Sequence, residues 1–334
     1  MNLDVLIPSL LLPAPMHKML PPPQAPALER LLARADRQVA VVPPGVSWLC
    51  ERWGMDSPYA IAPLLAEYDG IDTSNHAWMF AEPFHHASEQ KWQKLSPARL
   101  LELTAAESVE LIASLNAHFA DRALTFSAPT PSRWYVRCNP AEVPQTTPLD
   151  QARLGSPLDH QPTSLGSINW RAIQNEAQML LFSHPVNAER ETSGKPLVSG
   201  VWFWGGGIRP EFKKPAYCRV ITSSPLAKQL AKNSGIDVYP LAWDSVPSTD
   251  GNVLVVIDSC ADFVRDFDLL KWGHELERLD REWFLPISTT LGDGTIERLT
   301  IHSPLAEWTQ TFQLTRQNYL FRFWRTSKPL STYA

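Results

Sequence analysis

A short central segment of the chain carries residues that together could bind an anion. They come from a polar loop and from the end of the apolar run Val198 to Trp204, which leads directly into consecutive glycines. A guanidinium group offers paired donors to a phosphate or carboxylate, and glycine lets backbone amides approach a ligand closely. We therefore predict that a small anion, a phosphate or a carboxylate, binds at Asn187, Arg190, Gly205, Gly206, Gly207 and Arg209.

The same residues also fit a purely structural arrangement. The glycines do not form a G-x-G-x-x-G motif, and no Lys-Ser or Lys-Thr pair follows them as in a phosphate-binding P-loop. They could instead form a tight turn packed under Trp202 and Trp204, with Arg190 in a loop salt bridge. If the anion site is correct, we expect Arg190→Ala to weaken anion binding and leave the fold intact.

Other polar side chains indicate chemistry less directly. His85 and His86 lie close to Glu82, but adjacent strand residues point to opposite faces, so both histidines cannot easily join one metal site. Asp258 ends the apolar run Val253 to Ile257, where a functional carboxylate could lie, but we interpret it as a helix cap or loop acceptor. No hydrolase or metalloprotease motif is present. We therefore predict no catalytic residue, no metal and no cofactor.

The elements that would position these residues alternate between strands and helices. The run Val253 to Ile257 is apolar throughout, which is typical of a parallel strand covered on both faces. We predict an α/β fold in which one mostly parallel sheet has helices on both faces. Its strands are predicted at Leu3 to Ile7, Val198 to Trp204, Tyr217 to Thr222, Ile236 to Leu241 and Val253 to Ile257.

The middle of the chain predicts a small inserted α+β subdomain. Thr104 and Glu107 form a capping box before apolar residues at helical spacing, and this helix is expected to pack on a small sheet with Trp134 to Val136. We divide the chain into a first core part at 1–81, the inserted subdomain at 82–165 and a second core part at 166–334. The final segment Tyr319 to Arg325 alternates aromatic and basic residues and predicts a last strand.

Composition excludes several classes of partner. The 334 residues have a formal net charge of -5 and no basic tract, so we expect neither nucleic acid nor an anionic membrane as a partner. No run approaches the length needed to span a bilayer, and no secretory signal is recognisable. The cysteines are far apart without a C-x-x-C pair, which favours reduced, mostly buried thiols and a cytoplasmic location. The sequence predicts no oligomeric state.

Two central motifs resemble a known family. They read HPVN-x-x-R-x-x-x-G from His184 to Gly194 and VWFWGGG-x-x-P from Val201 to Pro210. They are similar to a segment of the archaeal-type cofactor-independent phosphoglycerate mutases, and more so to proteobacterial proteins of the phosphoglycerate mutase-like or regulatory RpfE type. The second resemblance covers most of the chain, with supporting matches at IPSL, PALERLLARA, LNAHF, RWYVR, NEAQMLL and FRFWR.

The resemblance implies an alkaline-phosphatase-like core, but this chain departs from the site of the active enzymes. Active members hold two divalent metals with Asp and His ligands and use a Ser or Thr nucleophile. Here the first strand ends Ile7-Pro8-Ser9 where an Asp-Gly is expected, and His302 stands alone near the C-terminus. The Asp-rich segment after the central strand contains a single histidine, His274, well inside the one long helix predicted over Asp262 to Phe284. Without clustered ligands, metal-assisted phosphoryl transfer cannot activate its nucleophile.

Three functions remain open from the sequence. The first, which we favour, is a degenerate relative of these mutases that has lost metal ligands and nucleophile and acts as a ligand-binding or regulatory protein. The second is an active phosphoglycerate mutase-like phosphotransferase that interconverts 2- and 3-phosphoglycerate. The third is a structural or interaction protein without a small-molecule site. Shared fold alone does not decide among them, because function belongs to the site.

Overall fold

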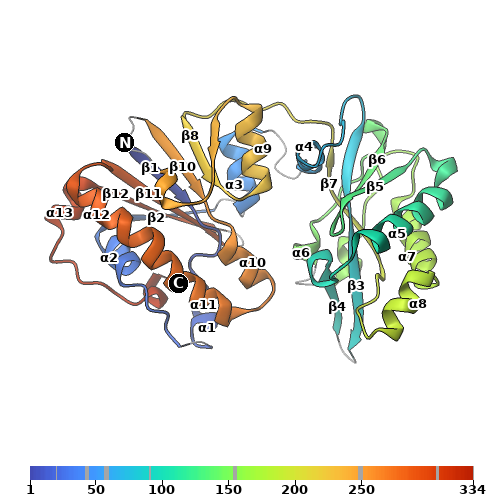
Figure 1. Ribbon diagram of the computed structural model, residues 1–334, viewed down its shortest axis with the longest axis horizontal. Coiled ribbons are helices and arrows are strands. Elements are labelled where there is room, and N and C mark those ends of the chain that lie inside the picture. Colours follow the sequence, from blue (N-terminus) through green and yellow to red (C-terminus); the bar gives the residue numbers. More distant parts are fainter. Residues whose placement is uncertain are drawn as a thin grey trace. The chain divides into compact units, whose positions relative to one another are not determined.

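The computed structural model describes residues 1–333 except 20, 42–44, 56–59, 90–91, 153–155, 247–250 and 306–307. Contacts divide the chain into two compact units (Figure 1). The larger unit comprises Met1–Asp56 and Phe212–Ala334, and the smaller unit comprises Ser57–Glu211. Each unit has its own sheet, and each is described by itself below.

The larger unit is built on a mostly parallel sheet with the order β2-β12-β11-β1-β10-β8-β9. The five strands from β11 to β9 are parallel to one another, whereas β12 runs antiparallel to β11 and β2 runs antiparallel to β12. This confirms the predicted α/β fold. The strands are β1 (Asn2–Leu6), β2 (Asp36–Ala40), β8 (Arg219–Thr222), β9 (Asp237–Tyr239), β10 (Asn252–Val256), β11 (Arg298–Leu305) and β12 (Trp308–Thr315).

Helices cover both faces of this sheet, as the apolar central strands require. Alternate residues such as Leu3 and Val5 of β1 pack in one cluster with Leu28, Leu276 and Ile287 from the helices of one face. That face carries α2 (Pro26–Arg34), α11 (Leu269–Leu279) and α12 (Leu285–Asp293), and the opposite face carries α3 (Gly45–Arg52) and α9 (Pro225–Asn233) (Figure 1). The remaining helices of the unit are α1 (Ala14–His17), α10 (Ser259–Arg265) and α13 (Arg316–Phe321).

The smaller unit is an α+β subdomain around a five-stranded sheet. Its strand order is β4-β3-β6-β5, and β7 also pairs with β3. The capping box is confirmed, since Thr104 and Glu107 bond each other's backbone amides at the start of α5. The elements are β3 (Ala77–Glu89), β4 (Trp92–Pro97), β5 (Thr125–Thr130), β6 (Arg133–Cys138), β7 (Gly200–Gly207), α4 (Ala62–Tyr68), α5 (Ala105–His118), α6 (Leu149–Ala152), α7 (Trp170–Phe182) and α8 (Pro185–Thr192).

The strand that leads into the glycines does not belong to the main sheet. β7 pairs antiparallel with β3, with Ala81 opposite Phe203, so the predicted placement of Val198 to Trp204 among the parallel strands is wrong. The compact units accordingly differ from our division at 82–165, because residues 57–81 and 166–211 also lie in the smaller unit. The reason is that α7 and β7 bury Trp170, Val201 and Phe203 in the core of that unit.

The end of the chain also differs from the prediction. The segment expected as a strand at Tyr319 to Arg325 instead forms the end of α13, up to Phe321, and the turns that follow it. This helix begins after Thr315, whose side chain accepts a hydrogen bond from the backbone N–H of Asn318. A local cap thus outweighs the alternation of aromatic and basic residues. The one long helix predicted over Asp262 to Phe284 is broken into α10, α11 and a π-helical turn at Asp280–Phe284.

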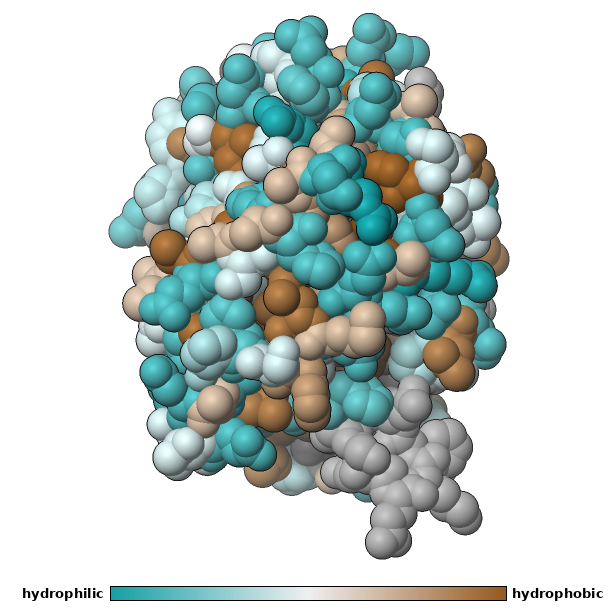
Figure 2. Space-filling model, turned by 90° about the vertical axis from the view of Figure 1, so that its right-hand side faces the viewer, coloured by the Kyte–Doolittle hydropathy of each residue, from teal (hydrophilic) through white to brown (hydrophobic). Residues whose placement is uncertain are grey.

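The described surface shows how polar and apolar side chains are distributed. In the view of Figure 2, hydrophobic residues form separate groups interspersed with hydrophilic ones.

Three of the four cysteines are buried and Cys218 is exposed, and none forms a disulfide. No helix in the described part of the chain combines the length and apolarity needed to cross a bilayer.

Candidate functional site

The carboxyl ends of the parallel strands are the first place to look for a site in an open α/β sheet. Asp258 lies just beyond β10 at the start of α10, half-buried, and its side chain makes no capping hydrogen bond. Desolvation raises the pKa of its carboxyl, and a hydrogen bond from Ser224 opposes that shift. Ser224 begins α9 after β8 without capping it through its side chain. The structure therefore brings a carboxyl and a hydroxyl together here.

The segment after β1 is held by backbone contacts to its neighbours. Ser9 adopts a left-handed backbone conformation with φ 58°, which is uncommon for a residue other than glycine. Its N–H donates to the carbonyl of Pro304 over 3.0 Å, and its carbonyl accepts from the indole N–H of Trp272 over 2.8 Å. These contacts fix the position at which the resemblance leads one to expect a metal-binding aspartate.

This edge does not offer the donors that two divalent metals need. Such a centre requires several carboxylates and imidazoles that converge within a few ångströms. Within the described residues no group of three or more His, Cys, Asp and Glu side chains could hold a metal ion. Asp262, one turn further along α10, pairs with Arg265 over 2.9 Å, and Glu275 of α11 is held by Ser259 and by an ion pair with Arg278. The residues present do not fit a two-metal site.

The glycines at the end of β7 are required by close packing. A Cβ added at Gly206 would overlap the side chain of Met79 on β3, and one at Gly207 would lie 2.9 Å from the Cβ of Ala60. Gly205 has φ 68°, and the pairing of β7 with β3 is irregular at this point, between Trp78 and Phe80. The glycines therefore let two strands approach where a larger residue could not.

The side chains of Asn187 and Arg190 donate their hydrogen bonds to oxygen atoms of the protein itself. Both lie in α8 rather than in a loop, because His184 caps this helix by accepting from the N–H of Val186 over 3.2 Å. The Asn187 amide donates to the carbonyls of Leu181 and Val198 over 2.7 and 2.9 Å. Its Oδ1 accepts from the N–H of Val198 over 2.9 Å, so all these contacts link α7, α8 and the approach to β7.

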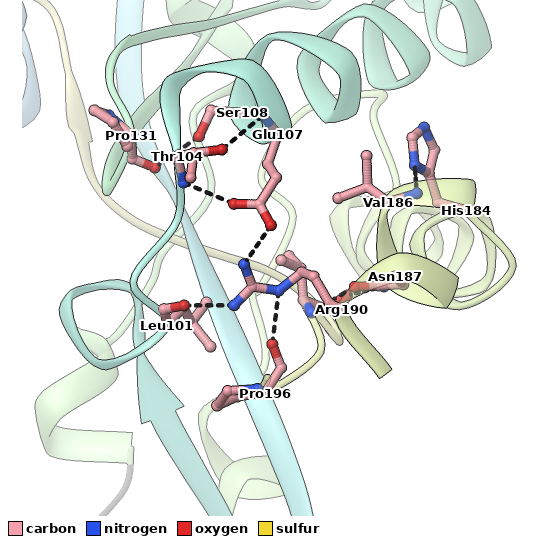
Figure 3. Close-up of polar contacts among 11 residues, drawn as sticks. Leu101, Thr104, Glu107, Ser108, Pro131, His184, Val186, Asn187, Arg190 and Pro196 are labelled. Atoms are coloured by element: carbon pink, nitrogen blue, oxygen red, sulfur yellow. Dashed lines mark hydrogen bonds and ion pairs between the residues drawn. The ribbon is translucent and has the colours of Figure 1, made fainter. Parts of the chain in front are cut away.

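Arg190 is almost fully buried, since 1% of its surface is exposed. Figure 3 shows its guanidinium pointing toward Glu107 and two backbone carbonyls. Its Nε donates to the carbonyl of Pro196 over 2.8 Å, its Nη1 to the carboxylate of Glu107 over 2.8 Å, and its Nη2 to the carbonyl of Leu101. The structure thus supplies a carboxylate from this chain at the place where we expected a bound anion.

Arg209 is positioned differently from Arg190. It pairs with Glu67 over 2.6 Å and is about half exposed. A hollow of about 280 Å³ adjoins this pair, lined by Glu67, Thr73, Ser74, Asn75, His76, Pro140, Ile208 and Arg209. The two guanidinium groups therefore hold different carboxylates, and a single anion site built from the six predicted residues stays a prediction.

The comparisons with known proteins bear on the fold. The chain is similar to the PH0037 protein from Pyrococcus horikoshii, with 14% identity, a TM-score of 0.53 and coverage of 94% of this chain and 87% of that one. This likeness shows a shared fold. A cofactor-independent phosphoglycerate mutase from Thermoplasma acidophilum aligns with 16% identity and a TM-score of 0.43, over 94% of this chain and 90% of that one. No family model and no curated protein matches the sequence.

The larger unit contains a polar cavity that we did not predict from the sequence. It lies beside Trp48, Arg52 and His302, and its lining includes Thr309 and Thr311 of β12. The available signal was the run of polar residues at alternate positions in β12, which places them on one face of the strand. That signal does not reveal that α3 covers the same face.

Proposed function

We propose that this protein is a degenerate relative of the cofactor-independent phosphoglycerate mutases that binds a ligand or regulates a partner without transferring a phosphoryl group. The proposal is supported by one observation above all. The segments directly after β1, β8 and β10 carry polar residues with one carboxylate among them, namely Ser9, Ser223, Ser224, Asp258 and Ser259. Two-metal chemistry needs several such ligands to activate a nucleophile and to neutralise the transferring group.

The arrangement of Asp258 and Ser224 favours the alternative of an active phosphotransferase. A half-buried carboxyl with a raised pKa, hydrogen-bonded to a hydroxyl at a strand end, resembles the pairing of a general base with a nucleophile. In a degenerate protein the same pair would be a remnant without a catalytic role. The alternative therefore makes a specific claim about Asp258.

Turnover of phosphoglycerate tests the proposal. Purified protein, before and after incubation with Mn²⁺ or Zn²⁺, is assayed for interconversion of 2- and 3-phosphoglycerate, and its metal content is measured. The degenerate protein is expected to show no turnover above a protein-free control and substoichiometric metal. Turnover that disappears in Asp258→Asn would establish the active enzyme and reject our proposal. Since Ser224 can hydrogen-bond to an amide as well, this variant is expected to fold.

A further inference from the structure

A polar cavity of about 370 Å³ lies in the larger unit, between α3 and the strands β2, β12 and β11. Its lining comes mainly from hydroxyl, amide and charged side chains. This volume is in the range of small-molecule sites. The lining residues are Gln38, Ala40, Trp48, Glu51, Arg52, His302, Thr309, Thr311 and Gln313.

The strand registers explain why these residues share one surface. Thr311 of β12 lies opposite His302 of β11 on one side and opposite Gln38 of β2 on the other. Side chains alternate along a strand, so Thr309 and Gln313 lie on the same face as Thr311. The helix α3 then places Trp48 against His302, with ring centroids 4.7 Å apart.

Two polar atoms of the lining residues are buried and find no hydrogen-bond partner within the described part of the chain. They are Nε2 of His302 and Oγ1 of Thr309, and these residues are 3% and 2% exposed. A buried polar group without a partner is costly, and most such groups in folded proteins are satisfied. Both unsatisfied atoms belong to residues that line the cavity, so a ligand in the cavity is the natural partner for them.

His302 is suited to donate a hydrogen bond as a neutral imidazole. Burial first, and the charge of Arg52 second, lower its pKa to about 3. Its Nδ1 lies 3.2 Å from the hydroxyl of Thr311. When Nδ1 accepts from that hydroxyl, Nε2 carries the proton and is a donor.

Arg52 supplies a positive charge at the same cavity. Its guanidinium lies 4.8 Å from the centre of the Trp48 ring, which fixes its orientation through a cation–π contact. Among the described residues no carboxylate is paired with it in an ion pair, although Glu51 lies beside it in the chain and also lines the cavity. Arginine recognises carboxylates and phosphates through paired donors.

We propose that this cavity binds a small hydroxylated organic anion, either a carboxylate or a phosphate ester. Arg52, the Nε2–H of His302 and the hydroxyl of Thr309 receive the anionic group, and Gln38, Thr311 and Gln313 receive its hydroxyl groups. The proposal deepens the binding role proposed above and rests on it. The failure of one proposal can be distinguished from the failure of the other. Binding measurements test this cavity, whereas turnover measurements test the proposed function.

Calorimetric titration with three matched probes tests the site. D-Glycerate and glycerol 3-phosphate carry the two kinds of anion on one polyol body, and glycerol carries neither. We expect at least one anion to bind and glycerol not to bind, and the tighter anion identifies the natural group. Absence of binding by both anions, or equal binding of glycerol, overturns the proposal.

Matched variants locate the binding in this cavity. Arg52→Gln is expected to weaken the anion about tenfold or more, since a charge-assisted hydrogen bond is lost. Glu51→Gln is expected to strengthen it up to about fivefold, because a surface carboxylate that repels the ligand is removed. Arg30→Gln removes the same charge from an exposed position of α2, on the opposite face of the sheet, and should change the affinity less than about twofold, since solvent screens distant charges. Wild-type affinity in Arg52→Gln would overturn the site.

The imidazole of His302 provides a second readout that does not depend on Arg52. In nitrogen-15 NMR spectra, the Nε2 resonance assigned by its loss in His302→Gln is expected to shift on addition of the binding anion. If that variant does not fold, the wild-type protein still reports the shift through the one resonance that responds to the anion and not to glycerol. Binding without any imidazole shift would contradict the assignment of His302.

Discussion

The Nη1 of Arg190 donates to the Oε1 of Glu107 over 2.8 Å, and this ion pair joins α8 to the first turn of α5. Glu107 also closes the capping box with Thr104, so one carboxylate serves a helix cap and a buried guanidinium at the same time (Figure 3). The arginine that most suggested an anion ligand is thereby satisfied by its own chain.

Loss of Arg190 should destabilise the protein, in contrast to our expectation from the sequence. Arg190→Ala leaves Glu107 and the carbonyls of Leu101 and Pro196 without their donor, and breaking a buried ion pair from one side costs about 3–5 kcal/mol. Arg209→Ala should cost less than about 1 kcal/mol, because that side chain is half exposed. Urea unfolding of both variants measures the difference, and equal small losses would show that Arg190 is not structural.

The same ion pair should make stability depend on pH in the acid range. Desolvation acts to raise the pKa of Glu107, but hydrogen bonds from the Thr104 backbone and from Arg190 outweigh it, so the pKa is lowered overall. A carboxyl with a lowered folded-state pKa stabilises above its unfolded pKa, and this contribution is lost as pH falls through the folded value. The stability gap between wild type and Glu107→Gln should therefore close on acidification. A gap that stayed constant would contradict this.

A methyl group added at Gly206 of β7 should destabilise the protein. Gly206→Ala places a Cβ against Met79 and Val143 and should cost about 1–3 kcal/mol by overpacking. Gly273→Ala is the matched control, since a Cβ there meets nothing within 4 Å inside α11 and should gain about 0.5–1 kcal/mol. Thermal unfolding would show shifts of opposite sign. A neutral Gly206→Ala would leave the glycines available for a ligand.

A second buried carboxylate should anchor the smaller unit. Asp69 accepts from Arg133 over 2.6 Å and from the hydroxyl of Tyr135 over 2.7 Å, and its side chain is 4% exposed. Asp69→Asn leaves the guanidinium without its counter-charge and should cost about 3 kcal/mol. Tyr135→Phe removes one hydrogen bond and should cost about 1 kcal/mol. Denaturant titration ranks the two, and a larger loss for Tyr135→Phe would contradict the electrostatic account.

Asp258 should lower stability at neutral pH. Desolvation raises its pKa, so the folded state binds this proton more tightly than the unfolded chain does, and stability falls as pH rises from the ordinary aspartate pKa through the folded one. Asp258→Asn should therefore be more stable than wild type at neutral pH and equal to it in acid. Guanidinium unfolding at several pH values tests this, and a variant that is less stable at neutral pH would refute it.

The sequence correctly predicted those structural elements that depend on residues close together in the chain. The capping box at Thr104 satisfies orphan amides within one turn, and the apolar run at Val253 can be buried only between two layers of helices. These features were correct because the residues that decide them are neighbours in the chain. The packing of the capping-box helix near Trp134 followed from the same stripe of apolar residues.

The sequence by itself determined the α/β class, the capping box and the apolar central strands, because hydrogen bonds and periodicity act over a few residues. Tertiary structure alone decided which sheet receives the strand Gly200–Gly207, since an apolar run fits either sheet and β3 supplied its partner. It also decided the role of Arg190, whose carboxylate partner lies 83 residues away at Glu107. A guanidinium pairs with a carboxylate that the fold brings close to it in space. Neighbouring residues in the sequence do not determine which carboxylate that is.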